Sequence, residues 1–313
     1  MAGSRFEYVR SFEVPDALPP DVYIVVRVDG RGFKRFCDEH SFKKPTDARG
    51  LALMNAAAAD VMREWGDVVL AFGHSDEFSF VLPPRATIFS RRAAKLATGI
   101  VSLFSAAYVF HWSRFFPTLT LRRPPAFDAR AVAYPRLRHV ADYFKWRQVD
   151  AHVNALYNEA FWALVQRRGD TPAAAHSALK GTLADAKHAL LFDLGINYAR
   201  LPEMFRRGAT LARGLAPRAA AGVGAGVGVG GAAVGVQGAA VAEADGAVTM
   251  AERELGEGAQ AQSESDFCSG GGFSVRIEDL ALPKSVTLCH PDFNAGGVGG
   301  GWLEGFFAAH EPL

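Results

Sequence analysis

The chain has 313 residues, a formal net charge of +1 and 49% hydrophobic residues. Its length suits one large domain or two ordinary ones, and its apolar content is sufficient for a core. Because the net charge is close to zero, any surface that binds a polyanion must come from local clusters of Arg and Lys. The three cysteines, Cys37, Cys268 and Cys289, show no paired spacing, which indicates a reducing compartment and no structural zinc. No basic segment followed by an apolar run occurs near the first residue, so we expect no signal peptide.

The first predicted strand covers residues 22–28 and leads directly into a carboxylate, Asp29. Two further predicted strands, 68–72 and 78–82, flank a short polar turn that carries Asp76. Since neighbouring strands of a sheet lie about 4.8 Å apart, the end of the first strand and the tip of this hairpin can bring Asp29 and Asp76 to one shared pair of ions. Carboxylate oxygens suit Mg²⁺, so the pattern predicts a site for two magnesium ions.

The helices between these strands complete a known layout. Thr46-Asp47 is typical of an N-cap for a helix over 48–65, and a longer helix is predicted from 88 to 112. Residues 130–134 are predicted as a fourth strand. The order strand-helix-strand-strand-helix-strand is the split βαβ, ferredoxin-like arrangement of an α+β fold. The palm of many polymerases and cyclases has this layout, which is an analogy of fold and does not establish an activity.

The C-terminal half is predicted to be helical and then of low complexity. Helices are expected over 141–166, after the cap Thr171-Pro172, and after the cap Thr182. Residues 219–242 are long enough to cross a bilayer, but they contain only Ala, Gly, Val and one Gln, so we interpret them as a flexible linker and expect no membrane association. The predicted parts are a palm-like catalytic domain (1–137), a helical lobe packed on it (138–213), a low-complexity linker (214–272) and a poorly defined C-terminal segment (273–313).

Each candidate carboxylate also has a purely structural interpretation, because an Asp beside a turn often only caps backbone N–H groups. The catalytic interpretation is favoured because Asp29 and Asp76 both follow buried strands, and because the glycines after Asp29 allow a phosphate chain to approach the backbone closely. Alternation along the third strand directs Glu77 away from Asp76. Glu77 is therefore expected to support the site or the fold rather than to bind metal.

Five motifs follow one another along the first two thirds of the chain. They are Asp29-Gly30-Arg31-Gly32-Phe33, Phe42-Lys43-Lys44-Pro45-Thr46-Asp47, Ser75-Asp76-Glu77-Phe78-Ser79-Phe80, Arg91-Arg92-Ala93-Ala94-Lys95 and His152-Val153-Asn154-Ala155-Leu156-Tyr157-Asn158. With these motifs in this order, the chain closely resembles the tRNA-His guanylyltransferase family over residues 4–211. Five ordered motifs are far more specific than any one of them, whereas the Ala/Gly/Val tract and most of the tail fall outside the resemblance.

The resemblance implies a nucleotidyltransferase that adds a guanosine to the 5′ end of tRNA-His, the reverse of the ordinary direction of polymerisation. In the family, ATP adenylylates the 5′ monophosphate of the tRNA, the 3′ hydroxyl of GTP attacks the activated end, and pyrophosphate is finally removed. By likeness, Asp29, the carbonyl of Gly30 and Asp76 would hold two Mg²⁺ ions. The implied catalytic residues are Asp29, Asp76, Ser75, Lys44 and His152. The implied nucleotide-binding residues are Asp29, Gly30, Arg31, Gly32, Phe33, Lys34, Lys44, Asp47, Ser75 and Asp76.

RNA contacts are implied at several basic and polar side chains, which makes the helical lobe a tRNA-contacting part. They are Arg92, Lys95, Arg130, His152, Asn158 and Lys187. Structural alternatives stay open for some of these residues: His152 suits a satisfied structural histidine, and the basic triplet that includes Arg92 and Lys95 suits a solvated helix face. Asp47 likewise suits an N-cap. Trp146 and Trp162 are expected to pack between helices rather than stack on bases.

The chain departs from the family pattern at a few positions. Ala155 stands where the family usually has Asn, which removes a hydrogen-bonding amide, and Gly32 also replaces a common Asn. Lys34, Thr46 and His74 replace a common His, Asn and Gln. None of these changes affects the expected metal ligands.

Two other functions remain open at this point. One is a template-dependent 3′–5′ polymerase that repairs truncated tRNA 5′ ends with the same palm, and the other is a tRNA-binding protein without catalysis. The resemblance also implies a homotetramer. We expect a cytoplasmic location, and whether the protein also enters the nucleus stays open.

Overall fold

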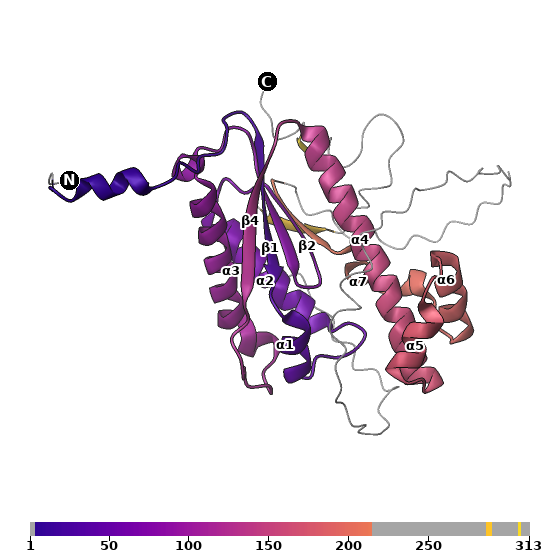
Figure 1. Ribbon diagram of the computed structural model, residues 1–313. Helices are drawn as coiled ribbons and strands as arrows, with labels where there is room; N and C mark the ends of the chain where they lie inside the picture. The colour runs from indigo at the N-terminus through magenta and orange to yellow at the C-terminus, as the bar shows by residue number, and fades with distance from the viewer. Residues whose placement is uncertain (1–3, 215–285, 290–305, 308–313) are drawn as a thin grey trace, which may run out of the picture. The chain divides into compact units, whose positions relative to one another are not determined.

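The computed structural model describes residues 4–214, 286–289 and 306–307. Its six strands form one sheet in the order β4-β1-β3-β2-β5-β6, and every neighbouring pair is antiparallel (Figure 1). The strands are β1 (Tyr23–Gly30), β2 (Leu70–His74), β3 (Glu77–Leu82), β4 (Phe127–Tyr134), β5 (Ala209–Arg213) and β6 (Val286–Cys289). The first four strands with their helices are the split βαβ arrangement, so the predicted α+β fold is confirmed.

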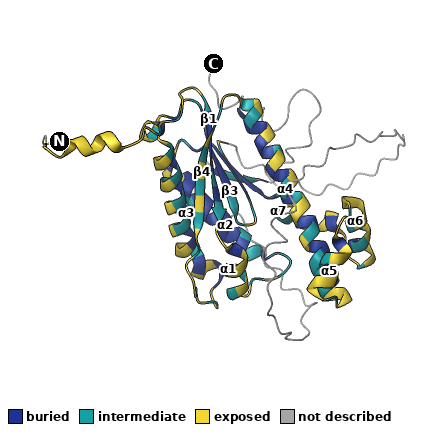
Figure 2. Cartoon of the chain, in the orientation of Figure 1, coloured by how far each residue is buried: buried dark blue, intermediate teal, exposed yellow. Residues whose placement is uncertain are grey.

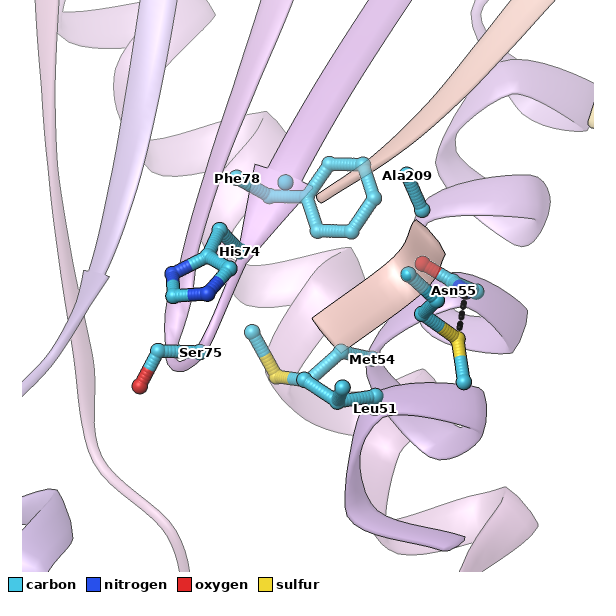
Figure 3. A pocket seen from close by; sticks show the side chains of 9 residues that line it. Leu51, Met54, Asn55, His74, Ser75, Phe78 and Ala209 are labelled. Carbon is cyan, nitrogen blue, oxygen red and sulfur yellow. Dashed lines mark hydrogen bonds between the residues drawn. The ribbon is translucent and has the colours of Figure 1, made fainter. Parts of the chain in front are cut away.

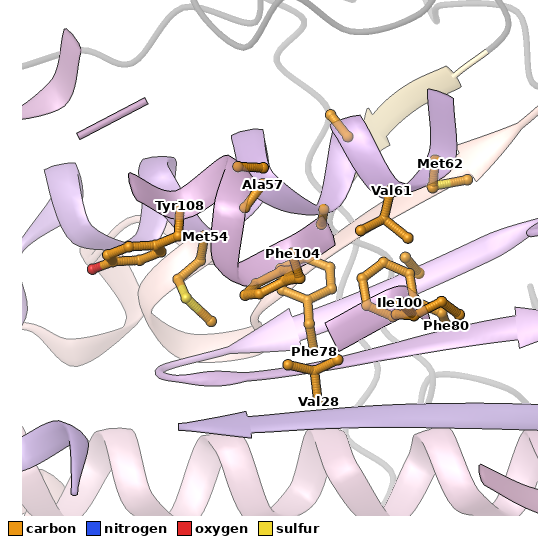
Figure 4. Packing of buried hydrophobic residues seen from close by; sticks show 14 of the residues in the cluster. Val28, Met54, Ala57, Val61, Met62, Phe78, Phe80, Ile100, Phe104 and Tyr108 are labelled. Atoms are coloured by element: carbon orange, nitrogen blue, oxygen red, sulfur yellow. The ribbon is translucent and has the colours of Figure 1, made fainter. Parts of the chain in front are cut away.

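Alternation along β1 divides the core into two parts. Ile24, Val26 and Val28 point to the face covered by α2 (Ala48–Glu64) and α3 (Ala93–Phe115), where aromatic rings and methionines fill the interior (Figure 4). Tyr23 and Val25 point to the other face, which the first turns of α4 (Leu137–Ala163) cover in part. Figure 2 shows the resulting buried strands between the helices. Helices thus pack on both faces of the sheet, and this packing holds the ends of its strands in place.

Several element boundaries differ from the prediction. β1 continues to Gly30, so Asp29 lies within the ladder, opposite Glu77 on β3. The predicted helix over 88–112 is a 3₁₀ turn, η2 (Ile88–Arg91), followed by α3. The break arises because Phe89, Ser90 and Arg91 adopt positive φ angles, which no helix tolerates.

Several short elements were missed by the sequence analysis. Among them are α1 (Phe33–Glu39), β5 and β6. The predicted helical lobe ran to residue 213, but β5 pairs with β2 and places Leu211 in one core and Ala212 in the other. Segments of four to seven residues are too short for periodicity to identify, and these form because the sheet and α3 provide partners for them.

The helical lobe is built around the second half of α4. It contains η3 (Leu164–Arg168), a π-helical turn, then α5 (Pro172–Leu179), α6 (Ala184–Asp193), η4 (Tyr198–Arg200) and α7 (Glu203–Arg207). The predicted cap at Thr171 is confirmed, since its hydroxyl accepts a bond from the Ala174 N–H at 3.2 Å. The predicted cap at Thr182 is wrong: α6 begins after Leu183, and the Thr182 hydroxyl instead donates to the Leu179 carbonyl.

Of the described helices, only α3 is long and apolar enough to cross a membrane. Its Leu96, Ile100 and Phe104 are fully buried in the core of the palm, which accounts for that apolar character. The tract 219–242, the one span considered from the sequence, lies outside the described residues, as do most of the linker and tail.

Candidate active site

Asp76 lies at the tip of the β2–β3 hairpin, directly above Gly30 at the end of β1. The tip has only two residues, Ser75 and Asp76, and Ser75 takes a left-handed conformation with φ of 56°. The Gly30 N–H donates to the Asp76 carbonyl at 3.0 Å, which joins the hairpin tip to the strand end. A Cβ atom on Gly30 would lie 2.6 Å from the Asp76 Oδ2, so only glycine allows this carboxylate to occupy its position.

Asp29 affects Asp76 through its charge. Burial and, to a smaller extent, the negative charge of Asp29 together raise the pKa of Asp76 to about 6. The Ser75 hydroxyl opposes this increase by a hydrogen bond. Repulsion of this kind acts between carboxylates that share a region with little water.

The two carboxylates reach this place from different sides of the sheet. Alternation along β1 directs Asp29 to the face of α4, where it accepts a bond from Arg27 at 3.1 Å. Asp76, above Gly30, lies on the side of α1 and the α2–α3 core. Both residues belong to the same end of the sheet, where β1 finishes beside the tip of the β2–β3 hairpin, and they interact there through their charges.

A row of ion pairs connects Asp29 to α4. Arg27 lies between Asp29 and Glu77, with 3.6 Å between its Nε and the Glu77 Oε2. Arg147, on α4, contacts the same Glu77 oxygen at 2.9 Å and also pairs with Asp150 at 2.9 Å. Burial raises the pKa of Glu77, while the two arginines lower it. The prediction that Glu77 supports the structure is therefore confirmed.

The pair Asp29 and Asp76 fits a divalent metal centre. Two repelling carboxylates, one of them above a glycine whose Cβ would fill the space, form a hard oxygen donor set that a cation would neutralise. Within residues 4–214, 286–289 and 306–307, no group of three or more His, Cys, Asp or Glu side chains could hold a metal ion. A metal here thus needs backbone oxygen, as from Gly30, or substrate oxygen to complete its shell.

The turn after Gly30 leads into α1. The N–H groups of Gly30 and Arg31 are already bound, the latter to the Ala126 carbonyl at 2.8 Å. Gly32 caps α1 with φ of 63°, and a Cβ there would meet nothing within 4 Å. The ring of Phe33 is buried in the core and stacks on Phe36, so Phe33 could offer a nucleotide only its backbone. The side chains of Arg31 and Lys34 are exposed.

Lys44 and Asp47 lie on the loop before α2. The Lys44 ammonium pairs with Asp38 at 2.7 Å and lies 5.8 Å from the Trp162 ring centre. Asp47 caps α2 by accepting from the Arg49 N–H at 3.0 Å, and it also accepts from the Lys43 N–H. Burial raises the pKa of Asp47, but its bonds with Arg49 and Lys43 outweigh burial and lower the pKa overall. The structural interpretation of Asp47 as an N-cap is confirmed, and a nucleotide contact stays a prediction.

A small cavity lies beside the hairpin tip, between α2, α7 and the ends of β2 and β3 (Figure 3). It is lined by Leu51, Met54, Asn55, Gly73, His74, Ser75, Phe78, Met204 and Ala209. Burial lowers the pKa of His74 to about 4, so this ring is neutral at physiological pH. The cavity is too small and apolar for a nucleotide, and the His74 ring bonds to the backbone of Phe205 on α7.

The predicted RNA contacts fall into separate regions of the chain. Arg92 and Lys95 are exposed at the start of α3, and Arg92 pairs with Asp16 at 3.0 Å. This region adjoins the beginning of β1, since the neighbouring Arg91 binds the Val22 carbonyl. Asp29 lies near the other end of that eight-residue strand, roughly 20 Å away. Within one chain, Arg92 and Lys95 therefore do not reach the carboxylate pair.

Arg91 belongs to the fold and not to the site. Its guanidinium donates to four carbonyl oxygens, those of Pro19, Val22, Pro84 and Ala86, at 2.7 to 3.0 Å. Arg91 is 8% exposed, and burial lowers its pKa. Of the two arginines, only Arg92 remains available to a phosphate.

The other predicted RNA contacts lie on the helical lobe and on β4. His152 contacts the Tyr198 hydroxyl through Nδ1 at 3.2 Å, with the His188 ring nearby. Lys187 donates to the Thr182 carbonyl, and burial lowers its pKa. Asn158 and Arg130 are exposed. Ala155, where the family usually has Asn, is 8% exposed, so this departure changes packing in the lobe more than a surface that RNA can reach.

The sequence analysis missed the ion pairs around Glu77. Arg27 was visible as the one charge in a buried strand, and a buried charge requires a partner. Arg147 carried no signal of its own, because it lies 70 residues from Glu77 along the chain. Trp146 was expected to be packed, but it is 56% exposed, since α4 turns its neighbour Arg147 towards the sheet instead.

A carboxylate pair at the end of a split βαβ sheet, beside a glycine turn, is the arrangement of a palm-type nucleotidyltransferase. The family model described as Thg1, tRNAHis guanylyltransferase, matches residues 6–135, and the model of the Thg1 C terminal domain matches residues 138–262. The chain belongs to the tRNA-His guanylyltransferase family.

Known relatives agree with this assignment. A tRNA(His) guanylyltransferase of Neurospora crassa is 50% identical over 216 residues, which are 68% of this chain and 74% of the relative. A probable tRNA(His) guanylyltransferase of Dictyostelium discoideum is 48% identical over 212 residues, 67% of this chain and 83% of the relative. The crystal structure of the Saccharomyces cerevisiae enzyme has a TM-score of 0.64 and 45% identity, and the match covers 66% of this chain and 93% of that one. A bacterial Thg1-like protein in complex with ATP shares the fold, with a TM-score of 0.55 and 23% identity.

Proposed function

We propose that the chain adds a guanosine to the 5′ end of tRNA-His, using ATP to activate the end and GTP as the donor. The proposal is supported by membership of the family and by relatives near 50% identity that carry this name. The observation that carries it is the Asp76 carboxylate held above Gly30, next to Asp29, at the end of β1.

Asp29, the Gly30 carbonyl and Asp76 are the residues that would hold two Mg²⁺ ions. Bound there, the ions would stabilise negative charge on phosphoryl oxygens and favour the ionised form of an attacking hydroxyl. The protein's own contribution is to fix the carboxylates. The bond from the Gly30 N–H holds the hairpin tip, and Arg27 orients Asp29 through the bond at 3.1 Å.

The nucleotide triphosphate is proposed to bind between the Gly30–Lys34 turn and the Lys44 loop. Backbone N–H groups of Gly32, Phe33 and Lys34 open α1, and the side chains of Arg31 and Lys34 are exposed next to them. Lys44 is held by Asp38 and would exchange this partner for a phosphate. Ser75 is exposed at the hairpin tip beside Asp76, within the same region.

The tRNA is proposed to contact the lobe and β4 through His152, Asn158, Lys187 and Arg130, with its 5′ end at Asp29. Arg92 and Lys95 lie roughly a strand length from Asp29 of their own chain. They would contact the RNA away from the reacting end, or serve a neighbouring subunit of the proposed homotetramer. We also propose a cytoplasmic location with access to the nucleus still to be tested.

The decisive experiment measures incorporation of labelled GTP into 5′-monophosphorylated tRNA-His, with ATP and with or without Mg²⁺. The intact chain should give a product one nucleotide longer, and Asp29→Asn and Asp76→Asn should reduce the rate by at least about a thousandfold, since each removes a metal ligand. Absence of any product with the intact chain and Mg²⁺ would overturn the proposal. If product forms only when a 5′-truncated tRNA is supplied, the activity is templated repair instead.

A further inference from the structure

The side chain of Trp146 stands on an exposed strip of α4. The indole is 56% exposed, and Val149 and Val153, three and seven residues later on the same helix face, are 48% and 49% exposed. Large apolar side chains grouped in this way are unusual on a protein surface unless something binds there.

One face of the indole is supported by a fixed cation. The Arg147 guanidinium lies 3.8 Å from the centre of the Trp146 ring. Arg147 cannot move freely, because it pairs with Glu77 and Asp150 at 2.9 Å and its side chain is only 8% exposed. The ring therefore rests on a rigid support, with much of its area open to solvent.

Aromatic contacts connect Trp146 to the open face of β4. Trp146 contacts Tyr143 with 6.1 Å between ring centres, and Tyr143 contacts Tyr134 on β4 at 5.7 Å. Arg130 and Val132, four and two residues before Tyr134, point to the same side of that edge strand and are exposed. We name the surface formed by Trp146, Val149, Arg130 and Val132 the Trp146 face.

The Trp146 face adjoins the reacting end of the sheet. Arg130 lies opposite Arg27, the residue that binds Asp29. Arg147, beneath the indole, shares Glu77 with Arg27. Three ion pairs, Arg147–Glu77, Glu77–Arg27 and Arg27–Asp29, thus connect the residue beneath the indole to the catalytic carboxylate.

We propose that Trp146 is a stacking platform for an unpaired base of the RNA substrate, next to the end that is extended, with Arg130 contacting its phosphate. An aromatic ring with an open face and a nearby arginine are the two components with which proteins bind single-stranded nucleic acid. Arg136 and Arg138, exposed where α4 begins, add positive charge along the same helix. The proposal rests on the proposed function only in taking the partner to be tRNA.

The test compares Trp146→Leu with Trp146→Phe in the full chain. Leu keeps an apolar side chain but cannot stack, whereas Phe can. Affinity for labelled 5′-monophosphorylated tRNA-His is measured at fixed salt by fluorescence anisotropy, without nucleotides. Stacking predicts that Leu weakens binding by about tenfold and Phe by less than about threefold. Phe110→Ala is the matched control, since Phe110 is 79% exposed on α3 at the other side of the sheet.

A second RNA that lacks the single-stranded 3′ end completes the test. If the platform holds an unpaired base, the intact chain and Trp146→Leu should bind this shortened RNA equally well. Equal affinity of the Leu and Phe variants for the full tRNA would overturn the proposal. A changed mass of Trp146→Leu in light scattering, together with unchanged RNA affinity, would also overturn the proposal. That result would mean that Trp146, Val149 and Val153 contact a second copy of the chain. These binding results do not depend on turnover, so they stand apart from the guanylylation assay.

Discussion

Replacement of Gly30 by alanine tests whether the position of Asp76 determines activity. A Cβ atom on residue 30 would lie 2.6 Å from Oδ2 and 2.8 Å from Cβ of Asp76, and 2.9 Å from the Phe33 ring. Ordinary contacts begin at 3.4 Å, so the carboxylate oxygen would be about 0.8 Å too close. Phe33 is buried in the core and cannot give way easily, so the hairpin tip must move.

The expected loss follows from that displacement. Metal–ligand distances tolerate about 0.2 Å, and a misplacement near 1 Å in an active site costs about a hundredfold in rate. We expect kcat/KM for guanylylation of tRNA-His to fall by about two orders of magnitude in Gly30→Ala, equivalent to about 2.7 kcal/mol of transition-state stabilisation. The Mg²⁺ concentration for half-maximal rate should rise, because one ligand is displaced while Asp29 is unchanged.

The assay is a Mg²⁺ titration of GTP incorporation, together with thermal unfolding. Gly66→Ala is the matched control, because residue 66 is exposed on a loop and a Cβ there meets nothing within 4 Å. A rate for Gly30→Ala within threefold of the intact chain, with the same Mg²⁺ dependence, would refute the reasoning. Asp76 would then not need its place above Gly30.

Three further predictions concern buried charge. Arg147→Met should lower the free energy of unfolding by about 2 kcal/mol in urea unfolding, because it leaves Glu77 with only Arg27 at 3.6 Å. Adding Glu77→Gln to Arg147→Met should recover part of this loss, whereas additive effects of the two substitutions would contradict the pairing. Arg91→Met should cost about 3 kcal/mol in the same measurement, since four carbonyls lose their donor, and a change below 1 kcal/mol would show that water replaces it. Burial raises the pKa of Glu159 to about 7, so the folded state favours its protonated form, and stability present below pH 4.5 is lost as pH rises through about 7. Glu159→Gln should therefore raise the Tm relative to the intact chain more at pH 8 than at pH 5, and a constant difference would be the contrary result.

The palm could be predicted because burial on both sides leaves a clear pattern in its strands. Residues 22–28 and 78–82 are nearly continuous apolar runs, as expected for strands covered on two faces. Their ends were less certain: β1 continues through Asp29 and Gly30, because Phe127 and Asp128 of β4 extend the ladder. A strand's last residues are determined by its neighbours rather than by its own composition.

The carboxylate pair was predicted as a pair, but its orientation was not. Alternation along β1 puts Asp29 on the side of Tyr23 and Val25, but it does not show that α4 covers that side. The position of Asp76 above Gly30 could not be predicted, since the direction of the hairpin tip depends on a single positive φ at Ser75. The exposure of Trp146 could not be predicted from the sequence either. Helical spacing shows which residues share a face of α4, but only the packing of Tyr143 and Arg147 on the sheet determines that Trp146 stays exposed.

The two faces of the sheet give the two carboxylates different kinds of support. Asp76 is fixed within the palm by Gly30 and the hairpin. Asp29 is bound by Arg27, which shares Glu77 with Arg147 of α4, the helix that continues into the lobe. Any shift of α4 on binding RNA would therefore act on Asp29 through charged contacts and leave Asp76 in place. RNA bound to the lobe can adjust one ligand of the proposed metal site against a fixed second ligand, which connects recognition of the tRNA to the geometry of the reacting end.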